Sequence, residues 1–327
     1  MNAPLTFKDY ATDQEVRWCP GCGDYAILKA VQKALAEDQA DPAKTVFVSG
    51  IGCSSRLPYY METYGFHTIH GRAPAVATGV KLANPELDVW VITGDGDGLS
   101  IGGNHLLHAL RRNINLNILL FNNEIYGLTK GQYSPTSRPG TTSPTSPNGS
   151  IDAPISAGQF AIGAGATFFA RGVDIDQKGM PGLFNAAKHH QGAAFVEILQ
   201  NCIVYNKDVF DDVVAKKTAA ETQIQVQHGE PLLFGKEQDK GLRLNPQSLS
   251  LEVVNVADVG LDAIQIHDET NPTLALMLAN LSGPTAMGVI LRREQPAFEQ
   301  DYWQAHPTTR SKRVRELLRT GNILDRR

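Results

Sequence analysis

The hydrophobic pattern of the chain alternates between short continuous apolar runs and longer segments with apolar residues three or four positions apart. The runs predict buried β-strands, and the spaced segments predict amphipathic helices. In the segment 24–36, Ile27, Val31 and Leu35 fall on one helical face. The predicted strands are 45–49, 66–69, 89–93, 116–121, 167–170 and 194–199, and the predicted helices are 24–36, 73–83, 101–112 and 178–190.

This alternation determines the expected fold class. Continuous apolar strands separated by helices predict an α/β fold, a parallel sheet with helices on both faces. After about residue 206 the alternation fades, and polar residues dominate as far as a short helical pattern at 274–281. We therefore expect an α/β domain over 1–205 and a C-terminal extension over 206–327 that contacts a partner.

The segment 134–150 is rich in Ser, Thr, Pro and Gly and has no hydrophobic periodicity. It is either a surface or disordered insertion or a functional loop. Loops this long inside a compact domain are more often functional.

Composition excludes some classes of partner. The formal net charge is −4, whereas binding to nucleic acid phosphates normally needs an excess of Lys and Arg. Neither an N-terminal apolar run nor a stretch of about 18 apolar residues is present in the sequence. We expect a cytoplasmic protein that binds neither nucleic acid nor a membrane.

Two polar motifs follow neighbouring predicted strands. Gly94-Asp95-Gly96-Asp97-Gly98 comes directly after the strand 89–93, and Asn122-Asn123 comes after the strand 116–121. One β-α-β unit would bring Asp95 and Asn123 to adjacent strand ends, where ligands bind in such sheets. Their oxygens suit Mg²⁺, which is usually shared with phosphates. The alternative is a glycine-rich turn in which Asp95 caps a helix.

The four cysteines, Cys19, Cys22, Cys53 and Cys202, suggest metal or redox chemistry in a reducing compartment. Cys19 and Cys22 form a CxxC turn before a helix, without the preceding strand of a thioredoxin-like motif. Together the four thiols could hold one zinc ion or one four-iron cluster. Their spacing leaves both possibilities open.

Longer strings carry a family resemblance. The segments GDGDGLSIGGNH at 94–105 and NNEIYGLTKGQYSPTS at 122–137 resemble the β subunits of 2-oxoacid:ferredoxin oxidoreductases, as do CPGCG at 19–23 and GCS at 52–54. The resemblance covers most of residues 15–210 and implies a thiamine diphosphate-binding domain of the diphosphate type. The family usually has Asp where this chain has Asn122, a departure that should be harmless because the second residue of the pair is the ligand.

The resemblance also implies site residues. Cys19, Cys22, Cys53 and Cys202 would hold one [4Fe–4S] cluster, Arg56 would meet the substrate carboxylate, and His70 would lie near the cofactor. The Mg²⁺ ligands would be Asp95, Asn123 and the main-chain carbonyl of Ile125. Thiamine diphosphate would contact Ile51, Gly52, Cys53, Ser54, Gly96, Asp97, Gly127 and Leu128.

The implied activity is oxidative decarboxylation of a 2-oxoacid with coenzyme A, with electrons passing through the cluster to ferredoxin, or the reverse carboxylation. The run 56–60 resembles 2-oxoglutarate enzymes more than pyruvate enzymes. The chain has room for only one thiamine-binding domain, so an α subunit must supply the pyrimidine-binding domain, and an (αβ)₂ assembly is expected.

Two alternatives belong to other classes. A non-redox thiamine decarboxylase or synthase subunit would use the cysteines for structural zinc. A zinc-stabilised interaction module would account for the cysteines but leave the GDG and Asn-Asn pair unexplained.

Overall fold

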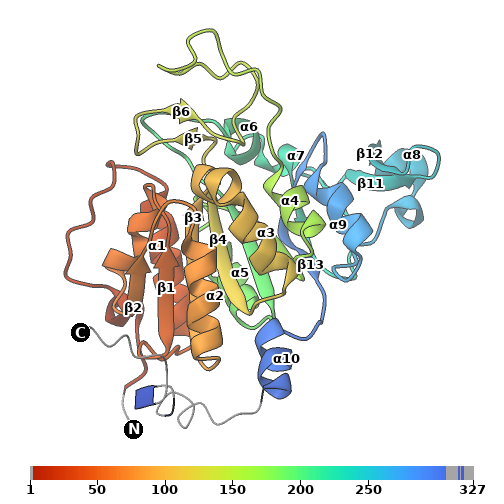
Figure 1. The fold of residues 1–327 in the computed structure, drawn as a ribbon. Helices are drawn as coiled ribbons and strands as arrows, with labels where there is room; N and C mark the ends of the chain where they lie inside the picture. Colours follow the sequence, from red (N-terminus) through yellow and green to blue (C-terminus); the bar gives the residue numbers. More distant parts are fainter. Residues whose placement is uncertain (1–2, 307–315, 317, 320–327) are drawn as a thin grey trace.

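A computed structural model describes residues 3–306, 316 and 318–319, and its centre is one eight-stranded sheet (Figure 1). The strand order is β2-β1-β3-β4-β8-β7-β13-β9. The first six strands of that order are parallel, whereas β13 runs antiparallel to β7, and β9 runs parallel to β13. The bounds are β1 (Thr45–Ser49), β2 (Tyr64–His67), β3 (Asp88–Gly94), β4 (Leu116–Asn122), β7 (Phe168–Val173), β8 (Ala193–Leu199), β9 (Gln223–Val226) and β13 (Thr285–Arg292).

Helices cover both faces of this sheet, as the sequence predicted (Figure 1). Successive strand residues point to opposite faces, so Val46 and Val48 pack with one set of helices and Phe47 with the other. Strands buried on both faces read as unbroken apolar runs. One face carries α1 (Asp24–Glu37) and α5 (Gly179–Lys188), and the other carries α2 (Ala73–Ala83), α3 (Gly103–Arg111), α4 (Ala157–Gly163) and α9 (Pro272–Ala279).

Helix α1 shows how the sequence produces one of these elements. Ile27, Val31 and Leu35 recur at helical spacing and are fully buried, and each such side chain stabilises the fold by about 1.5–3 kcal/mol. The helix ends at Glu37, and Gln39 then turns the chain with φ +50°.

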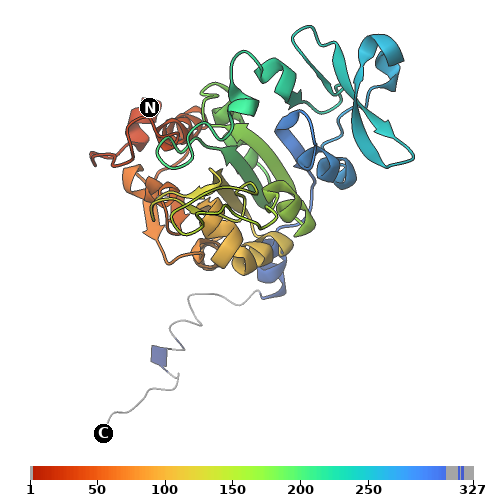
Figure 2. The ribbon, with the colours of Figure 1, turned by 90° about the horizontal axis from the view of Figure 1, so that it is seen from above.

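Residues beyond 205 are partly built into the main sheet. They supply β9 and β13, while β10 (Leu233–Phe234), β11 (Lys240–Asn245) and β12 (Ser250–Asn255) form a separate antiparallel sheet to one side (Figure 2). The division expected at residue 205 therefore falls inside one continuous sheet. Contact between the extension and a partner stays a prediction.

Shorter elements complete the fold. The site contains the 3₁₀ helix Ser54–Tyr60, the short π-helix Asp97–Ile101 and the β5–β6 hairpin (Ile125–Tyr126, Gln132–Tyr133). The others are the 3₁₀ helices Phe7–Tyr10 and Leu261–Ala263, α6 (Asp211–Val214), α7 (Ala219–Thr222), α8 (Val256–Val259) and α10 (Phe298–Ala305). Within the described residues, every helix is too short or too polar to cross a bilayer.

Candidate active site at the carboxyl edge of the sheet

The loops that follow β1, β2, β3 and β4 meet in one pocket at the carboxyl edge of the sheet. Most of the residues predicted from the resemblance form its wall, although they come from four separate segments of the chain. They are residues 51–54, His70, Asp95, Asn123, Ile125, Gly127 and Leu128.

Asp95, the predicted metal ligand after β3, is only 2% exposed. Its Oδ2 lies 2.5 Å from the hydroxyl of Ser134 and 2.6 Å from that of Thr136. Burial raises the pKa of Asp95, and hydrogen bonds from these two hydroxyls partly offset that effect. A buried carboxylate in a pocket wall is a donor that a divalent cation would stabilise.

Asn123 presents its carbonyl oxygen in a fixed orientation. Its Nδ2 donates to Oε1 of Gln200 at 2.8 Å, and its Oδ1 accepts from the backbone N–H of Ile125 at 3.2 Å. The neighbouring Asn122 turns away from the pocket and donates to Glu197 at 2.8 Å. The second amide of the pair therefore lines the pocket, and its role as a Mg²⁺ ligand stays a prediction.

The loop 134–150 follows the β5–β6 hairpin (Figure 1), and its first residues contact side chains of the site. Thr136 lies between Asp95 and Asn122, 3.0 Å from Oδ1 of the latter, and Ser137 donates to the carbonyl of Glu124. Composition marked this segment as a candidate functional loop but did not assign Ser134 or Thr136 to the metal site.

Asp97 fastens two of the loops together. Its Oδ1 accepts from the backbone N–H of Ile51 and of Gly71, at 3.1 and 2.7 Å. The same oxygen lies 2.6 Å from Nδ1 of His70, and Oδ2 accepts from Thr93 at 2.6 Å. The side chain is fully engaged, so any contact between Asp97 and a diphosphate would come from its backbone.

The same bond determines how His70 meets the pocket. Because Nδ1 faces a carboxylate oxygen, Nδ1 donates the hydrogen bond to Asp97, and Nε2 is the ring nitrogen that this bond does not use. Tyr126, which the sequence did not single out, stands edge-on to His70 with 6.4 Å between ring centroids. Its hydroxyl donates to the carbonyl of Gly96 at 3.0 Å. A Cβ on Gly96 would come within 2.2 Å of the tyrosine ring, so this position requires glycine.

The four cysteines, all free thiols, are brought together from three distant segments. The backbone N–H of Gly23, beside the CxxC turn, donates to the carbonyl of Asn201 at 3.4 Å. The indole of Trp18 donates to the carbonyl of Cys53 at 2.7 Å. A Cβ built on Gly127 would lie 3.5 Å from the sulfur of Cys202 and 3.7 Å from that of Cys53. These contacts place the sulfurs of Cys53 and Cys202 beside the pocket wall, and they hold the CxxC turn next to the segment that carries Cys202.

Burial disfavours the ionised form of the thiols. Burial raises the pKa of Cys22, and it raises the pKa of Cys53 to about 12, with Asp24 and the other cysteines adding to the effect. Thiolates at neutral pH would therefore need a cationic centre. Among the described residues, no three His, Cys, Asp or Glu side chains close around a single ion.

Comparisons with known proteins agree with this geometry. Residues 50–198 match the family described as thiamine pyrophosphate enzyme, C-terminal TPP binding domain. The chain is 51% identical over 302 residues to 2-oxoglutarate oxidoreductase subunit KorB of Mycobacterium tuberculosis, covering 90% of this chain and 80% of that protein. It is 48% identical over 197 residues to 2-oxoacid:ferredoxin oxidoreductase 1, subunit beta, of Aeropyrum pernix, covering 60% and 62%.

The chain is a β subunit of the 2-oxoacid:ferredoxin oxidoreductase family. A solved 2-oxoglutarate:ferredoxin oxidoreductase from Magnetococcus marinus, with 2-oxoglutarate, coenzyme A and succinyl-CoA bound, matches with a TM-score of 0.77 and 33% identity, covering 96% of each chain. The predicted family and the predicted α/β fold are both confirmed.

Arg56 is placed less directly than the other predicted residues of this β subunit. It lies in the 3₁₀ helix after Cys53 and donates through Nε to the hydroxyl of Tyr60 at 3.1 Å. It does not line the pocket, but its charge lowers the pKa of Cys53, which does. Its role toward a substrate carboxylate stays a prediction.

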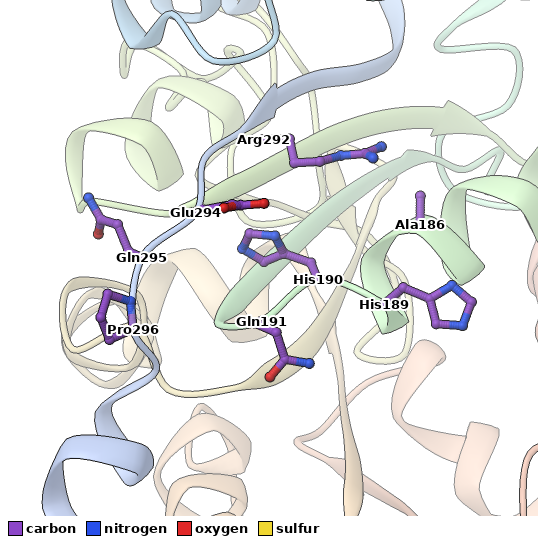
Figure 3. Close-up of a pocket in the computed structure, with 8 residues that line it drawn as sticks. All are labelled: Ala186, His189, His190, Gln191, Arg292, Glu294, Gln295 and Pro296. Carbon is purple, nitrogen blue, oxygen red and sulfur yellow. The ribbon is translucent and has the colours of Figure 1, made fainter.

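A second cavity lies at the opposite, amino-terminal edge of the sheet and contains none of the predicted residues (Figure 3). His190 and its neighbours at the end of α5 lie across from Arg292, the last residue of β13, and from Glu294 just after it. Burial, with the charge of Arg292, lowers the pKa of His190 to about 4, so the ring is neutral. It bonds to Thr167 at 2.7 Å, which indicates a structural role.

Proposed function

We propose that this chain is the cofactor-binding β subunit of a 2-oxoglutarate:ferredoxin oxidoreductase. The complex would convert 2-oxoglutarate and coenzyme A into succinyl-CoA, CO₂ and a proton, and two electrons would pass singly to ferredoxin. The observation that carries the proposal is that the sulfurs of Cys53 and Cys202 lie at Gly127, in the wall of the pocket of Asp95 and Asn123. Decarboxylation and one-electron transfer would then share one site.

The residues present fit the cofactors that the family implies. Asp95, Asn123 and the carbonyl of Ile125 would hold Mg²⁺, a hard cation that takes oxygen ligands. Cys19, Cys22, Cys53 and Cys202 would hold one [4Fe–4S] cluster. Thiamine diphosphate would supply the electron sink that decarboxylation of a 2-oxoacid requires.

Residues of this chain would orient the substrate and keep the site ordered. Asp97 would hold the loops of Ile51 and His70 in register, and His70 would have Nε2 available for a hydrogen bond in the pocket. Arg56 would meet the substrate carboxylate, where a planar guanidinium can bind in a bidentate fork. The smallness of Gly127 would let the cluster approach the cofactor.

A partner α subunit would complete the site with the pyrimidine-binding domain. This part of the proposal is supported by exposed apolar side chains on the edge strand β2 and beside the pocket. Tyr64 is 64% exposed and Ile69 74%, and Leu128 in the pocket wall is half exposed. Exposed large apolar side chains near a pocket are typical of an interface. The C-terminal extension would add further partner contacts.

The experiment is to prepare the αβ complex anaerobically and measure iron, acid-labile sulfide and dye reduction with several 2-oxoacids. We expect iron and sulfide in equal amounts, four of each per β subunit, and coenzyme A-dependent reduction with 2-oxoglutarate. Zinc without sulfide would contradict the redox function. Activity with pyruvate and none with 2-oxoglutarate would contradict the substrate.

A further inference from the structure

Gln200 lies between the two proposed cofactor sites. It follows β8 directly, is 1% exposed, and precedes the cluster ligand Cys202 by two positions. Its Oε1 accepts from Nδ2 of Asn123 at 2.8 Å. Its Nε2 lies 3.3 Å from the sulfur of Cys22 and 2.8 Å from the carbonyl of Asn201. One buried amide therefore contacts a proposed magnesium ligand and a proposed cluster ligand.

The direction of these hydrogen bonds is determined by backbone groups at both ends. The N–H of Ile125 can only donate, so Asn123 must turn Oδ1 toward it and Nδ2 toward Gln200. The carbonyl of Asn201 can only accept, so Gln200 must turn Nε2 toward it and toward Cys22. Reversing either amide would set donor against donor or acceptor against acceptor.

We propose that Gln200 is a positioning residue that couples the two sites. The inference rests on the proposed function, because it requires both the metal and the cluster to bind. Gln200 fixes Asn123 so that its carbonyl oxygen faces the metal, and it donates a hydrogen bond to the cluster thiolate of Cys22.

Each contact has a separate physical consequence. An outer partner that orients a metal ligand typically contributes 10–100-fold to metal affinity. A hydrogen bond to a cluster sulfur stabilises the more negative, reduced cluster and so raises its reduction potential. Removing Gln200 is therefore expected to weaken magnesium binding and to make the cluster harder to reduce.

Two substitutions separate these consequences. Gln200→Leu removes both contacts at similar volume. Gln200→Glu keeps an acceptor for Asn123 but replaces the donor that faces Cys22 with a negative oxygen. The matched control is Gln32→Leu, because Gln32 is a buried glutamine on α1 that contacts the backbone carbonyl of Tyr60.

The measurements use the anaerobic αβ complex. One is the Mg²⁺ concentration needed for thiamine diphosphate binding, followed by calorimetry, and the other is a redox titration of the cluster by electron paramagnetic resonance. For Gln200→Leu we expect about tenfold weaker Mg²⁺ binding and a cluster about tenfold harder to reduce, or ~59 mV for one electron. For Gln200→Glu we expect the potential to fall at least as far, with Mg²⁺ binding near wild type.

The outcomes are decisive in either direction. Wild-type values for Gln200→Leu in either measurement overturn the coupling, as does an equal change in Gln32→Leu. Loss of Mg²⁺ affinity in Gln200→Glu equal to that in Gln200→Leu overturns the role in orienting Asn123. A wild-type complex without a cluster signal or Mg²⁺-dependent cofactor binding would refute the proposed function as well. If the wild-type complex shows both and the Gln200 variants behave like it, only this inference is refuted.

Discussion

The two edges of the main sheet both bury polar side chains, but they use them differently. At the amino-terminal edge, Asn113 accepts from Thr167 and from the backbone N–H of Ala193, at 2.7 and 2.8 Å, and donates to the carbonyl of Pro296 at 3.0 Å. These donors and acceptors pair with one another and join the segments that meet at this edge. Such a hydrogen-bond network contributes to stability, and its bonds join segments of the fold.

At the carboxyl edge, hydrogen bonds hold the side chains in place, yet metal-ligand atoms remain at the pocket wall. Asp95, Asn123 and Cys53 are fixed by hydrogen bonds from neighbouring loops but still line the pocket. Burial disfavours the ionised forms of these carboxylate and thiol groups, which a bound cation would stabilise. The difference teaches that hydrogen bonds hold functional polar groups in place but leave some of their atoms available for a ligand.

The largest effect that tests this comparison is expected from Cys53→Ser. Replacing one of four thiolates should abolish the cluster and with it all ferredoxin-linked activity, because no other cysteine is available in the chain. Iron and sulfide analysis of the αβ complex, with circular dichroism as the folding control, measures this. A variant that keeps four irons and full activity would contradict the ligand set.

Asp95→Asn should weaken Mg²⁺ binding by more than about 100-fold, beyond the 10–100-fold typical of outer partners. The cofactor-free protein should be no less stable than wild type, because burial already disfavours the Asp95 carboxylate. Calorimetric Mg²⁺ titration and thermal melting check the two parts. A lower melting temperature without Mg²⁺ would show that Asp95 is structural, like the amino-terminal edge.

Asn113→Ala should have the opposite effect: it should lower the stability of the fold and leave the activity unchanged. Asn113 adopts φ +52°, a conformation that alanine disfavours, and its bonds at the amino-terminal edge would be lost. We expect about 2 kcal/mol less stability. Denaturant unfolding measures the loss, and activity per folded molecule is the control. A fall in that activity at full Mg²⁺ and cofactor loading would break the contrast between the two edges.

Thr136→Val should weaken Mg²⁺ binding about tenfold, as expected for a partner that orients a metal ligand. The change removes the hydroxyl 2.6 Å from Asp95 at nearly constant volume. Thr141→Val in the same loop is the control, since Thr141 donates only to the nearby carbonyl of Arg138. Equal Mg²⁺ affinities in the two variants would show that the loop 134–150 does not support the metal site.

The smallest effect concerns pH and the amino-terminal edge. The pKa of His190 is about 4 when folded and 6.5 ordinarily, so the unfolded chain binds the extra proton between these values. The stability that the neutral His190 ring provides is therefore complete above pH 6.5 and is lost as the pH falls toward 4. The loss amounts to about 1 kcal/mol at pH 5.5. His190→Gln should flatten the fall in melting temperature between pH 6.5 and 5.5. An unchanged slope would assign it to other groups.

Local pattern was sufficient for much of the fold. The strand 45–49 and the helix 73–83 have the predicted bounds, because the strand is buried throughout and the helix buries one face along its length. The strand predicted at 66–69 lies at Tyr64–His67, where every residue is exposed and the apolar pattern gives little guidance. Strand β13 was missed because it returns to the sheet antiparallel after a long excursion.

The site divides in the same way. Sequence strings identified Asp95, Asn123 and the cysteines, whose chemistry is intrinsic to the side chain. They did not identify Thr136, Tyr126 or Gln200, because a hydroxyl, a phenol or an amide becomes specific only through what it contacts.

The amino-acid sequence by itself determined the family, the alternation of strands and helices, and the donor atoms available for metal and cluster. Only the tertiary structure decided which donors meet, because parallel strands bring loops distant in sequence to one edge of the sheet. It also decided which side chains hold those donors, since Gln200 bridges Asn123 and Cys22 across three separate segments. Hydrogen bonds of that kind require donor and acceptor to be placed to within a few tenths of an ångström, and such placement exists only after the core has packed.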